Sequence, residues 1–312
     1  SHTIKEQPYN RELLLKMMEL NISMVDYEVL KNQKGKRLLG FGRYAGIVGA
    51  YNGFLTYGLK SGKYNLKGAH NCEDRAEMEG EMSKIKLSNE KIIITGNGRV
   101  GSGILEIILK ANIREVSKSE LLNNTFDEAV FVHLKTMDYN VRIDASESNK
   151  SEFYKQPELY CSSFMDYAKQ ADIFIAGHYY GASSPYLFTR EDAKHSDFNI
   201  KVVADVSCDI DGPVASTIRP STIVDPIYGY NPISETEDSF IQEGNIAVMA
   251  VDNLPCELPK DASEDFGNEM LEKILPSLIM SDDEQIIENA TICKNGDLTP
   301  NFEYLRNYVN GN

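Results

Sequence analysis

The feature that most constrains the fold of this chain is an apolar strand that leads directly into a glycine-rich turn and then a helix. The strand is KIIIT at 91–95, the turn is GNGRVGSG at 96–103, and ILEIILKA at 104–111 begins an amphipathic helix. The glycines follow the G-x-G-x-x-G spacing of a turn that holds the diphosphate of a dinucleotide. The flanking strand and helix strengthen this interpretation, and a glycine-rich turn that binds nothing is the alternative.

Each glycine has a physical role in such a turn. Gly96 lets the chain turn sharply, and Gly98 lacks a Cβ atom, so a diphosphate can approach the backbone. Gly101 and Gly103 let the helix pack closely on the sheet, while the helix N-terminus offers N–H donors to phosphates. We therefore expect dinucleotide contacts from Gly96, Gly98, Arg99, Val100 and Gly101.

The next strand, IREVS at 113–117, should end in an acid that holds the ribose 2′-hydroxyl. It ends instead in Ser117 and Lys118, and Glu115 lies two positions early. A hydroxyl and an ammonium suit a 2′-phosphate better, so we place Ser117 and Lys118 at the cofactor and predict NADP rather than NAD. In the alternative, Lys118 is a solvated surface residue and Glu115 reaches the ribose.

Further apolar strands alternate with helical or polar segments along the chain. They are expected at 128–134, 171–180, 200–207 and 246–255. This alternation predicts an α/β fold with a Rossmann-type parallel sheet that is covered on both faces. Helices are expected at 11–20, 45–60 and 265–279, and two N-terminal strands at 22–30 and 37–41. The glycines and alanines of 45–60 suggest close packing against a neighbour.

Charge and cysteine content restrict the class of partner. Lys and Arg total 32 against 47 Asp and Glu, a net charge of −15. Without a basic block, this argues against nucleic acid or an anionic membrane as the main partner. No apolar run approaches the roughly 18 residues of a membrane helix. The five scattered cysteines form no C-x-x-C pair, so we expect neither a metal site nor disulfides. This cysteine usage fits a reducing cytoplasm best. A homo-oligomer is possible.

Four stretches together resemble the lysine-forming saccharopine dehydrogenase and lysine–ketoglutarate reductase family, within the alanine dehydrogenase superfamily. They are FGRYAGIVGA (41–50), TGNGRVGSG (95–103), VVADVSCDIDGP with TIRPSTIVDP (202–226), and VMAVDNLPCELPKDASEDFG (248–267). The resemblance implies two α/β domains with a cleft between them. It also implies hydride transfer between a nicotinamide and the secondary amine carbon of saccharopine, with hydrolysis to lysine and 2-oxoglutarate.

The resemblance extends to single residues outside the glycine turn. His2 matches a histidine near the reacting amine, and Lys5, Glu28 and Arg37 match residues that line the substrate pocket. Asp209 matches an aspartate that alanine dehydrogenases place beside the nicotinamide. The loop that contacts the nicotinamide end of the cofactor matches Asn253, Leu254 and Pro255. From sequence alone, Asp209 and Asp211 could equally be turn residues before Gly212-Pro213.

The resemblance also divides the chain and exposes one departure. It implies a remnant of the substrate domain at 1–45, a dinucleotide-binding domain at 46–245, and a nicotinamide loop with the C-terminal segment at 246–312. The family has a segment with a catalytic lysine in a G-x-K-E-like motif before the S-H-T stretch, and this sequence lacks it. We therefore expect a member that is truncated at its N-terminus. An alanine- or opine-type dehydrogenase and a catalytically silent dinucleotide-binding protein remain alternatives.

Overall fold

The computed structural model describes residues 2–181 and 183–311, and these form two compact units. The larger unit is Gly42–Ala262, and the smaller combines Ser1–Phe41 with Ser263–Asn312. The boundaries between these units lie at 41/42 and 262/263, whereas the predicted domain boundaries are 45/46 and 245/246. Each unit is described by itself below.

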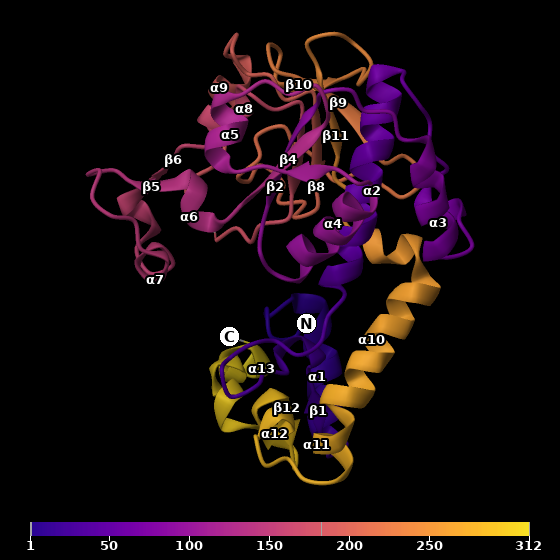
Figure 1. Cartoon of the computed structure of the whole chain (residues 1–312). Helices are drawn as coiled ribbons and strands as arrows, with labels where there is room; N and C mark the ends of the chain where they lie inside the picture. Colours follow the sequence, from indigo (N-terminus) through magenta and orange to yellow (C-terminus); the bar gives the residue numbers. More distant parts are fainter. Residues whose placement is uncertain (1, 182, 312) are drawn as a thin grey trace. The chain divides into compact units, whose positions relative to one another are not determined.

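The larger unit is built on an eight-stranded sheet (Figure 1). Its strand order is β10-β9-β11-β8-β7-β2-β4-β3. The six strands from β11 to β3 are parallel, and β9 and β10 add an antiparallel edge. The prediction of an α/β fold with a Rossmann-type sheet is confirmed. The strand bounds are β2 Lys91–Thr95, β3 Arg114–Glu115, β4 Val130–Leu134, β7 Ile173–Ala176, β8 Val202–Asp205, β9 Ile227–Asn231, β10 Thr236–Asp238 and β11 Ile246–Met249.

Helices cover both faces of this sheet because its central strands are apolar throughout. In β2, Ile92 and Ile94 face one core cluster and Ile93 faces the other, as the two-residue period of a strand requires. The first cluster includes side chains of α2 (Gly42–Ser61), α3 (Arg75–Glu81) and α4 (Arg99–Lys110). The second includes side chains of α5 (Lys118–Asn123), α6 (Thr136–Tyr139), α8 (Met165–Ala168) and α9 (Arg190–Lys194).

A small excursion lies between β4 and β7. It contains a two-stranded antiparallel ladder of β5 (Asn140–Arg142) and β6 (Tyr160–Ser162). The chain between these strands forms α7 (Lys150–Phe153) and a 3₁₀ helix at Pro157–Leu159. Phe153 and Tyr160 pack edge to face with ring centroids 5.2 Å apart, which gives the excursion an aromatic core of its own.

The smaller unit has a three-stranded sheet of order β1-β12-β13. Its core gathers Leu14, Ile292 and Leu305 in one cluster and Leu30, Leu39 and Ile286 in another. The elements are α1 (Arg11–Glu19), β1 (Met24–Val25), α11 (Leu275–Ile279), α12 (Ile286–Ala290), β12 (Thr291–Lys294), β13 (Asp297–Leu298) and α13 (Arg306–Asn310). The helix α10 (Pro259–Lys273) spans the 262/263 boundary.

Three predicted elements differ from the structure. The strand expected at 22–30 is reduced to Met24–Val25, because the Asp26 carboxylate accepts the Glu28 N–H at 2.9 Å and starts a 3₁₀ helix at Tyr27–Val29. The strand expected at 37–41 is only one bridge, between Lys31 and Arg37. The helix expected at 265–279 begins earlier and is divided, because Pro276 in the first turn of α11 has no N–H to continue the hydrogen bonds of α10.

The helices predicted at 11–20 and 45–60 are confirmed as α1 and α2. Within the described residues, no helix is at once long enough and apolar enough to cross a lipid bilayer.

Candidate functional site

The turn after β2 requires glycine at two positions because backbone atoms pass very close by. Gly96 has φ +95°, a conformation that disfavours a side chain, and a Cβ there would overlap the carbonyl of Gly177 on the neighbouring segment. A Cβ at Gly101 would overlap the carbonyl of Gly96. The turn therefore closes tightly upon itself and against the end of β7.

Gly98 lies in a different environment. It is the N-cap residue of α4 with φ −94°, and a Cβ at this position would meet no atom within 4 Å. The backbone is thus open at the start of a twelve-residue helix, whose first-turn N–H groups have no partner within the helix. Arg99 and Val100 begin that helix. An anion can approach this open face and meet the N–H donors and the helix dipole.

Close packing of α4 against α2 fixes the position of the helix that follows the turn. A Cβ at Gly46 would overlap the Val100 carbonyl, and a Cβ at Gly103 would overlap the Arg43 carbonyl. The expected close packing of the glycine-rich helix is therefore present. Gly103, however, approaches α2 and not the sheet, because α2 lies directly against α4 (Figure 1).

Two histidines from the segments on either side of β2 contact its end and the first residue of the turn. His133, on β4, lies with its Nε2 2.6 Å from the Gly96 carbonyl oxygen and donates to it in that tautomer. His178, just after β7, has its Nδ1 2.9 Å from Thr95 Oγ1, and its Nε2 is buried without a hydrogen-bond partner among the described residues. Burial lowers the pKa of His178 to about 4, so the ring is neutral near pH 7. No local motif in the sequence predicts either contact.

A buried aspartate organises the loop after β8. Asp205 is fully buried and accepts hydrogen bonds from the Ser207 hydroxyl at 2.6 Å and the Thr217 hydroxyl at 2.7 Å. It also accepts the N–H groups of Ser207 and Cys208 at 3.1 and 3.2 Å. Burial raises the pKa of Asp205. The same DVSCD motif suggested Asp209 instead, although an acid at the strand end was a signal for Asp205.

Asp209 lies in the turn that follows. Its carbonyl accepts the Gly212 N–H at 3.0 Å, and Asp211 adopts φ +50° and pairs with Arg190 at 2.8 Å. Both aspartates therefore lie in a backbone turn, as the alternative interpretation of Asp209 and Asp211 predicts. The Asp209 side chain is half-buried, and burial raises its pKa.

The loop after β11 meets the loop after β8. Cys208 Sγ donates to the Ala250 carbonyl at 3.1 Å. Burial raises the pKa of Cys208, and the charges of Asp205 and Asp252 raise it further. Asn253 is the exposed N-cap of the 3₁₀ helix Leu254–Glu257, and Leu254 is buried in the core beside α2. Because β2, β7, β8 and β11 are parallel, their loops share one edge of the sheet.

Ser117 and Lys118, which are predicted to lie at the cofactor, follow a strand at the edge of the sheet. The strand that precedes them, β3, is the outermost strand of the sheet and pairs with β4, while β4 pairs with β2. Ser117 Oγ accepts the Glu120 N–H at 3.2 Å as the N-cap of α5. Lys118 forms an ion pair with Asp138 at 2.5 Å.

The remaining predicted residues belong to the smaller unit. His2 and Lys5 are exposed, and His2 Nδ1 contacts the Tyr9 hydroxyl, with ring centroids 5.6 Å apart. Glu28 is half-buried in a 3₁₀ helix, not within the apolar strand that was expected. Arg37 is exposed and its Nε donates to the Leu39 carbonyl at 2.8 Å. Their roles in a substrate pocket stay predictions.

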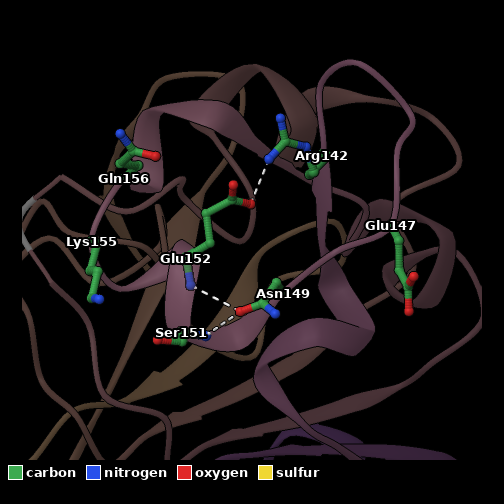
Figure 2. Close-up of a pocket in the computed structure, with 7 residues that line it drawn as sticks. All are labelled: Arg142, Glu147, Asn149, Ser151, Glu152, Lys155 and Gln156. Atoms are coloured by element: carbon green, nitrogen blue, oxygen red, sulfur yellow. Dashed lines mark hydrogen bonds and ion pairs between the residues drawn. The ribbon is translucent and has the colours of Figure 1, made fainter.

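The excursion carries a polar hollow of about 810 Å³ beside α7 (Figure 2). Arg142 pairs there with Glu152 at 2.5 Å and with Asp144 at 2.9 Å, and the Asn149 side chain accepts the Ser151 and Glu152 N–H groups. The arginine is thus neutralised within the excursion, and we assign no ligand to this hollow. Residues 2–181 and 183–311 contain no group of three His, Cys, Asp or Glu side chains suited to a metal ion.

The tight turn, the open Gly98 and the shared loop edge are typical of a dinucleotide-binding fold. The alanine dehydrogenase/PNT, C-terminal domain family matches residues 66–301, which is most of the chain. The chain belongs to this family.

Named relatives of this family member are distant. It is 26% identical to the mouse (Mus musculus) mitochondrial alpha-aminoadipic semialdehyde synthase over 98% of the chain and 38% of that protein. It is 24% identical to the NAD(+), L-lysine-forming saccharopine dehydrogenase of Candida albicans over 88% of the chain and 68% of that protein. The chain thus spans about two fifths of the length of the mammalian synthases.

A solved L-alanine dehydrogenase has the same fold. It superposes with a TM-score of 0.58 at 15% sequence identity, over 97% of this chain and 73% of the other. This likeness concerns the fold alone. The family resemblance seen in the sequence, with its α/β dinucleotide-binding fold, is confirmed.

The residues of this family member fit a dinucleotide at the glycine turn. Gly98 leaves its backbone open, and the overlaps at Gly96 and Gly101 show that the turn is closed as tightly as glycine permits. His178 Nε2 is a buried polar atom beside the turn without a described partner, which a bound group could satisfy.

Proposed function

We propose that this chain is an NAD(P)-dependent oxidoreductase that acts on the CH–NH group of an amino acid. The observation that carries this proposal is the glycine turn at the end of the central strand, with Gly98 open and the first turn of α4 beside it. Membership of the alanine dehydrogenase/PNT family supports the same conclusion. When bound, the nicotinamide dinucleotide supplies the hydride acceptor or donor of the reaction.

The proposed substrate is saccharopine, converted to or from lysine and 2-oxoglutarate. The support is that curated relatives are named as lysine-forming saccharopine dehydrogenases and aminoadipic semialdehyde synthases. A substrate with several carboxylates needs cationic partners, for which we propose Lys5 and Arg37. For Glu28 we propose contact with a substrate ammonium.

For proton transfer we propose His2. The secondary amine must lose its proton before hydride leaves the carbon, and imidazole titrates nearest to neutral pH. The exposed ring of His2 is accessible to such a proton. Its contact with the Tyr9 hydroxyl gives the ring a defined neighbour.

For the loops at the sheet edge we propose contacts with the nicotinamide end of the dinucleotide. Asp209 has a half-buried carboxylate there, and Asn253, Leu254 and Pro255 follow β11 at the same edge. The neutral His178 is suited to hold the turn through Thr95 without adding charge.

The test is a spectrophotometric assay of reduced dinucleotide. Saccharopine would be offered with NAD and NADP separately, and lysine, 2-oxoglutarate and reduced dinucleotide would be offered for the reverse reaction. We expect turnover with saccharopine or in the reverse mixture. Alanine with NAD is the control. Turnover with alanine but not with saccharopine would contradict the proposed substrate and indicate an alanine-type dehydrogenase. Dinucleotide binding without turnover on any amino acid would instead indicate a silent binding protein.

A further inference from the structure

The strand next to the glycine turn differs from the one that chain order suggests. β4 pairs with β2 over its whole length, from Lys91–Val130 to Thr95–Leu134. β3 pairs with β4 on the far side, and so it is separated from β2 by a full strand. The end of β3, which carries Ser117 and Lys118, is therefore not the strand end beside the turn.

In a doubly wound sheet, the residue that recognises the ribose 2′ position lies at the carboxyl end of the strand adjacent to the glycine-turn strand. Two strands, β4 and β7, flank β2. The chain after β7 carries Gly177 and the buried His178, so β4 is the neighbour whose end offers an exposed charged side chain. Because Leu134 is the register partner of Thr95, Lys135 follows β4 where Gly96 follows β2. His133 binds the two ends together through its contact with the Gly96 carbonyl at 2.6 Å.

The charges at this strand end favour a phosphate over a hydroxyl. Lys135 is exposed, and among the described residues its ammonium forms no ion pair. The nearby carboxylate, Asp138, is already engaged, since Oδ2 accepts the Lys135 N–H at 2.7 Å and Oδ1 pairs with Lys118 at 2.5 Å. An acid occupied in this way is poorly suited to accept hydrogen bonds from a ribose 2′-hydroxyl.

We propose that Lys135, at the end of β4, is the residue that recognises the 2′-phosphate of NADP. This rests on the proposed function, because it specifies the adenosine end of the same dinucleotide site. Lys118 is a positioning residue: it neutralises Asp138 and so removes a negative charge that would repel the phosphate. The strand order thus moves the specificity determinant from the end of β3 to the end of β4.

The test measures the dissociation constants of NADP, NAD and 2′,5′-ADP by titration calorimetry, with the intact chain. We expect wild type to bind NADP more tightly than NAD and to bind 2′,5′-ADP. Lys135→Ala should weaken NADP and 2′,5′-ADP roughly 10- to 100-fold and change NAD less than about threefold, the range for a charge-assisted hydrogen bond. Lys118→Ala should reduce the NADP preference by a smaller factor, again with NAD unchanged.

Lys201→Ala is the matched control. Lys201 is an exposed lysine just before β8, at the amino edge of the same sheet, where it pairs with Asp172 at 2.7 Å. The Lys201→Ala substitution should leave the dissociation constants of NADP, NAD and 2′,5′-ADP unchanged.

Two results would overturn the assignment while NAD and NADP still bind. The first is an unchanged ratio of the NADP and NAD dissociation constants in Lys135→Ala. The second is a larger loss of NADP affinity in Lys118→Ala than in Lys135→Ala, which would place the subsite at the end of β3. Failure of wild type to bind either dinucleotide would instead overturn the proposed function, and this assignment with it.

Discussion

At the scale of single residues, the first two glycines of the turn, Gly96 and Gly98, have different roles. Gly96 is required by the backbone itself, through its φ of +95° and the nearby Gly177 carbonyl. Gly98 has an ordinary φ and open space around it, so the folded chain alone does not need glycine there. A glycine that the fold does not require is a candidate for a contact with a ligand.

This difference predicts opposite effects for two substitutions. Gly98→Ala should change the free energy of unfolding by less than about 1 kcal/mol and weaken dinucleotide binding at least about tenfold, because the added methyl group occupies the approach to the backbone. Gly96→Ala should cost about 2–4 kcal/mol of stability through strain and overlap. Urea unfolding and a fluorescence titration with reduced dinucleotide measure both quantities. Unchanged dinucleotide affinity in Gly98→Ala would contradict the diphosphate contact.

A second residue-scale feature is the buried carboxyl of Glu257. It is 2% exposed, accepts the Asn52 side-chain N–H at 2.8 Å and lies 3.7 Å from His70 Nδ1. Burial raises the pKa of Glu257 to about 7 in the folded protein. The folded state therefore binds a proton that the unfolded chain releases near its ordinary pKa of 4.5.

The sign of the pH effect follows from this raised pKa. The contribution of Glu257 to stability is present below about pH 4.5 and is lost as the pH rises through about 7. Between pH 5 and 8 the wild type should lose up to about 3 kcal/mol relative to Glu257→Gln, which keeps the acceptor for Asn52 and cannot ionise. Urea unfolding at several pH values measures the difference. Glu243→Gln, at an exposed position, is the control, and parallel pH slopes for wild type and Glu257→Gln would contradict the prediction.

At the scale of elements, the pairing of α2 with α4 decides where the glycine turn sits. Backbone meets backbone at Gly46 with Val100 and at Gly103 with Arg43, so neither helix tolerates a Cβ at the crossing. This close approach leaves few ways for the start of α4 to shift relative to β2.

A pair of glycine substitutions in helices tests this contact. Gly46→Ala should cost about 2–4 kcal/mol because all three of its nearest atoms belong to the α4 backbone, which cannot move independently. Gly80→Ala, in α3 with no atom within 4 Å, should instead stabilise the chain by roughly 0.5–1 kcal/mol. Thermal and urea unfolding compare the two. Equal effects of the two substitutions would show that helix propensity, and not the crossing, dominates.

At the scale of the whole molecule, the proposed roles divide between the two compact units. The glycine turn, Asp209 and Lys135 belong to Gly42–Ala262. His2, Lys5, Glu28 and Arg37 belong to the other unit. A change in the smaller unit that leaves the larger unit folded should therefore affect substrate and dinucleotide differently.

Arg37→Ala provides this test. We expect the KM for saccharopine to rise about tenfold or more, since a carboxylate would lose a charged partner, while the dissociation constant of the dinucleotide stays unchanged. Arg306→Ala is the matched control in the same unit, because Arg306 pairs with Asp297 and Glu303 at 2.8 Å. Equal saccharopine KM values for wild type and Arg37→Ala would remove Arg37 from the proposed pocket.

The sequence by itself determined the parallel sheet and its glycine turn. Apolar, β-branched runs such as 91–95 and 202–205 have no stable place except a sheet buried on both faces, and a strand–turn–helix with this glycine spacing is a local property of the chain. The family resemblance was also present in local motifs. The helix α1 was predicted at nearly its observed position because its apolar residues recur at helical spacing, and α2 was also predicted within three residues of its observed bounds.

Only the tertiary structure decided the features that depend on which segments become neighbours. The order β3-β4-β2 cannot be read from chain order, since strand pairing is chosen by packing over the whole sheet. That order is the reason why we propose Lys135, and not Lys118, for the ribose subsite. The contacts of His133 with Gly96 and of His178 with Thr95 likewise join residues tens of positions apart. Local motifs record what a segment forms, whereas long-range packing decides what that segment touches.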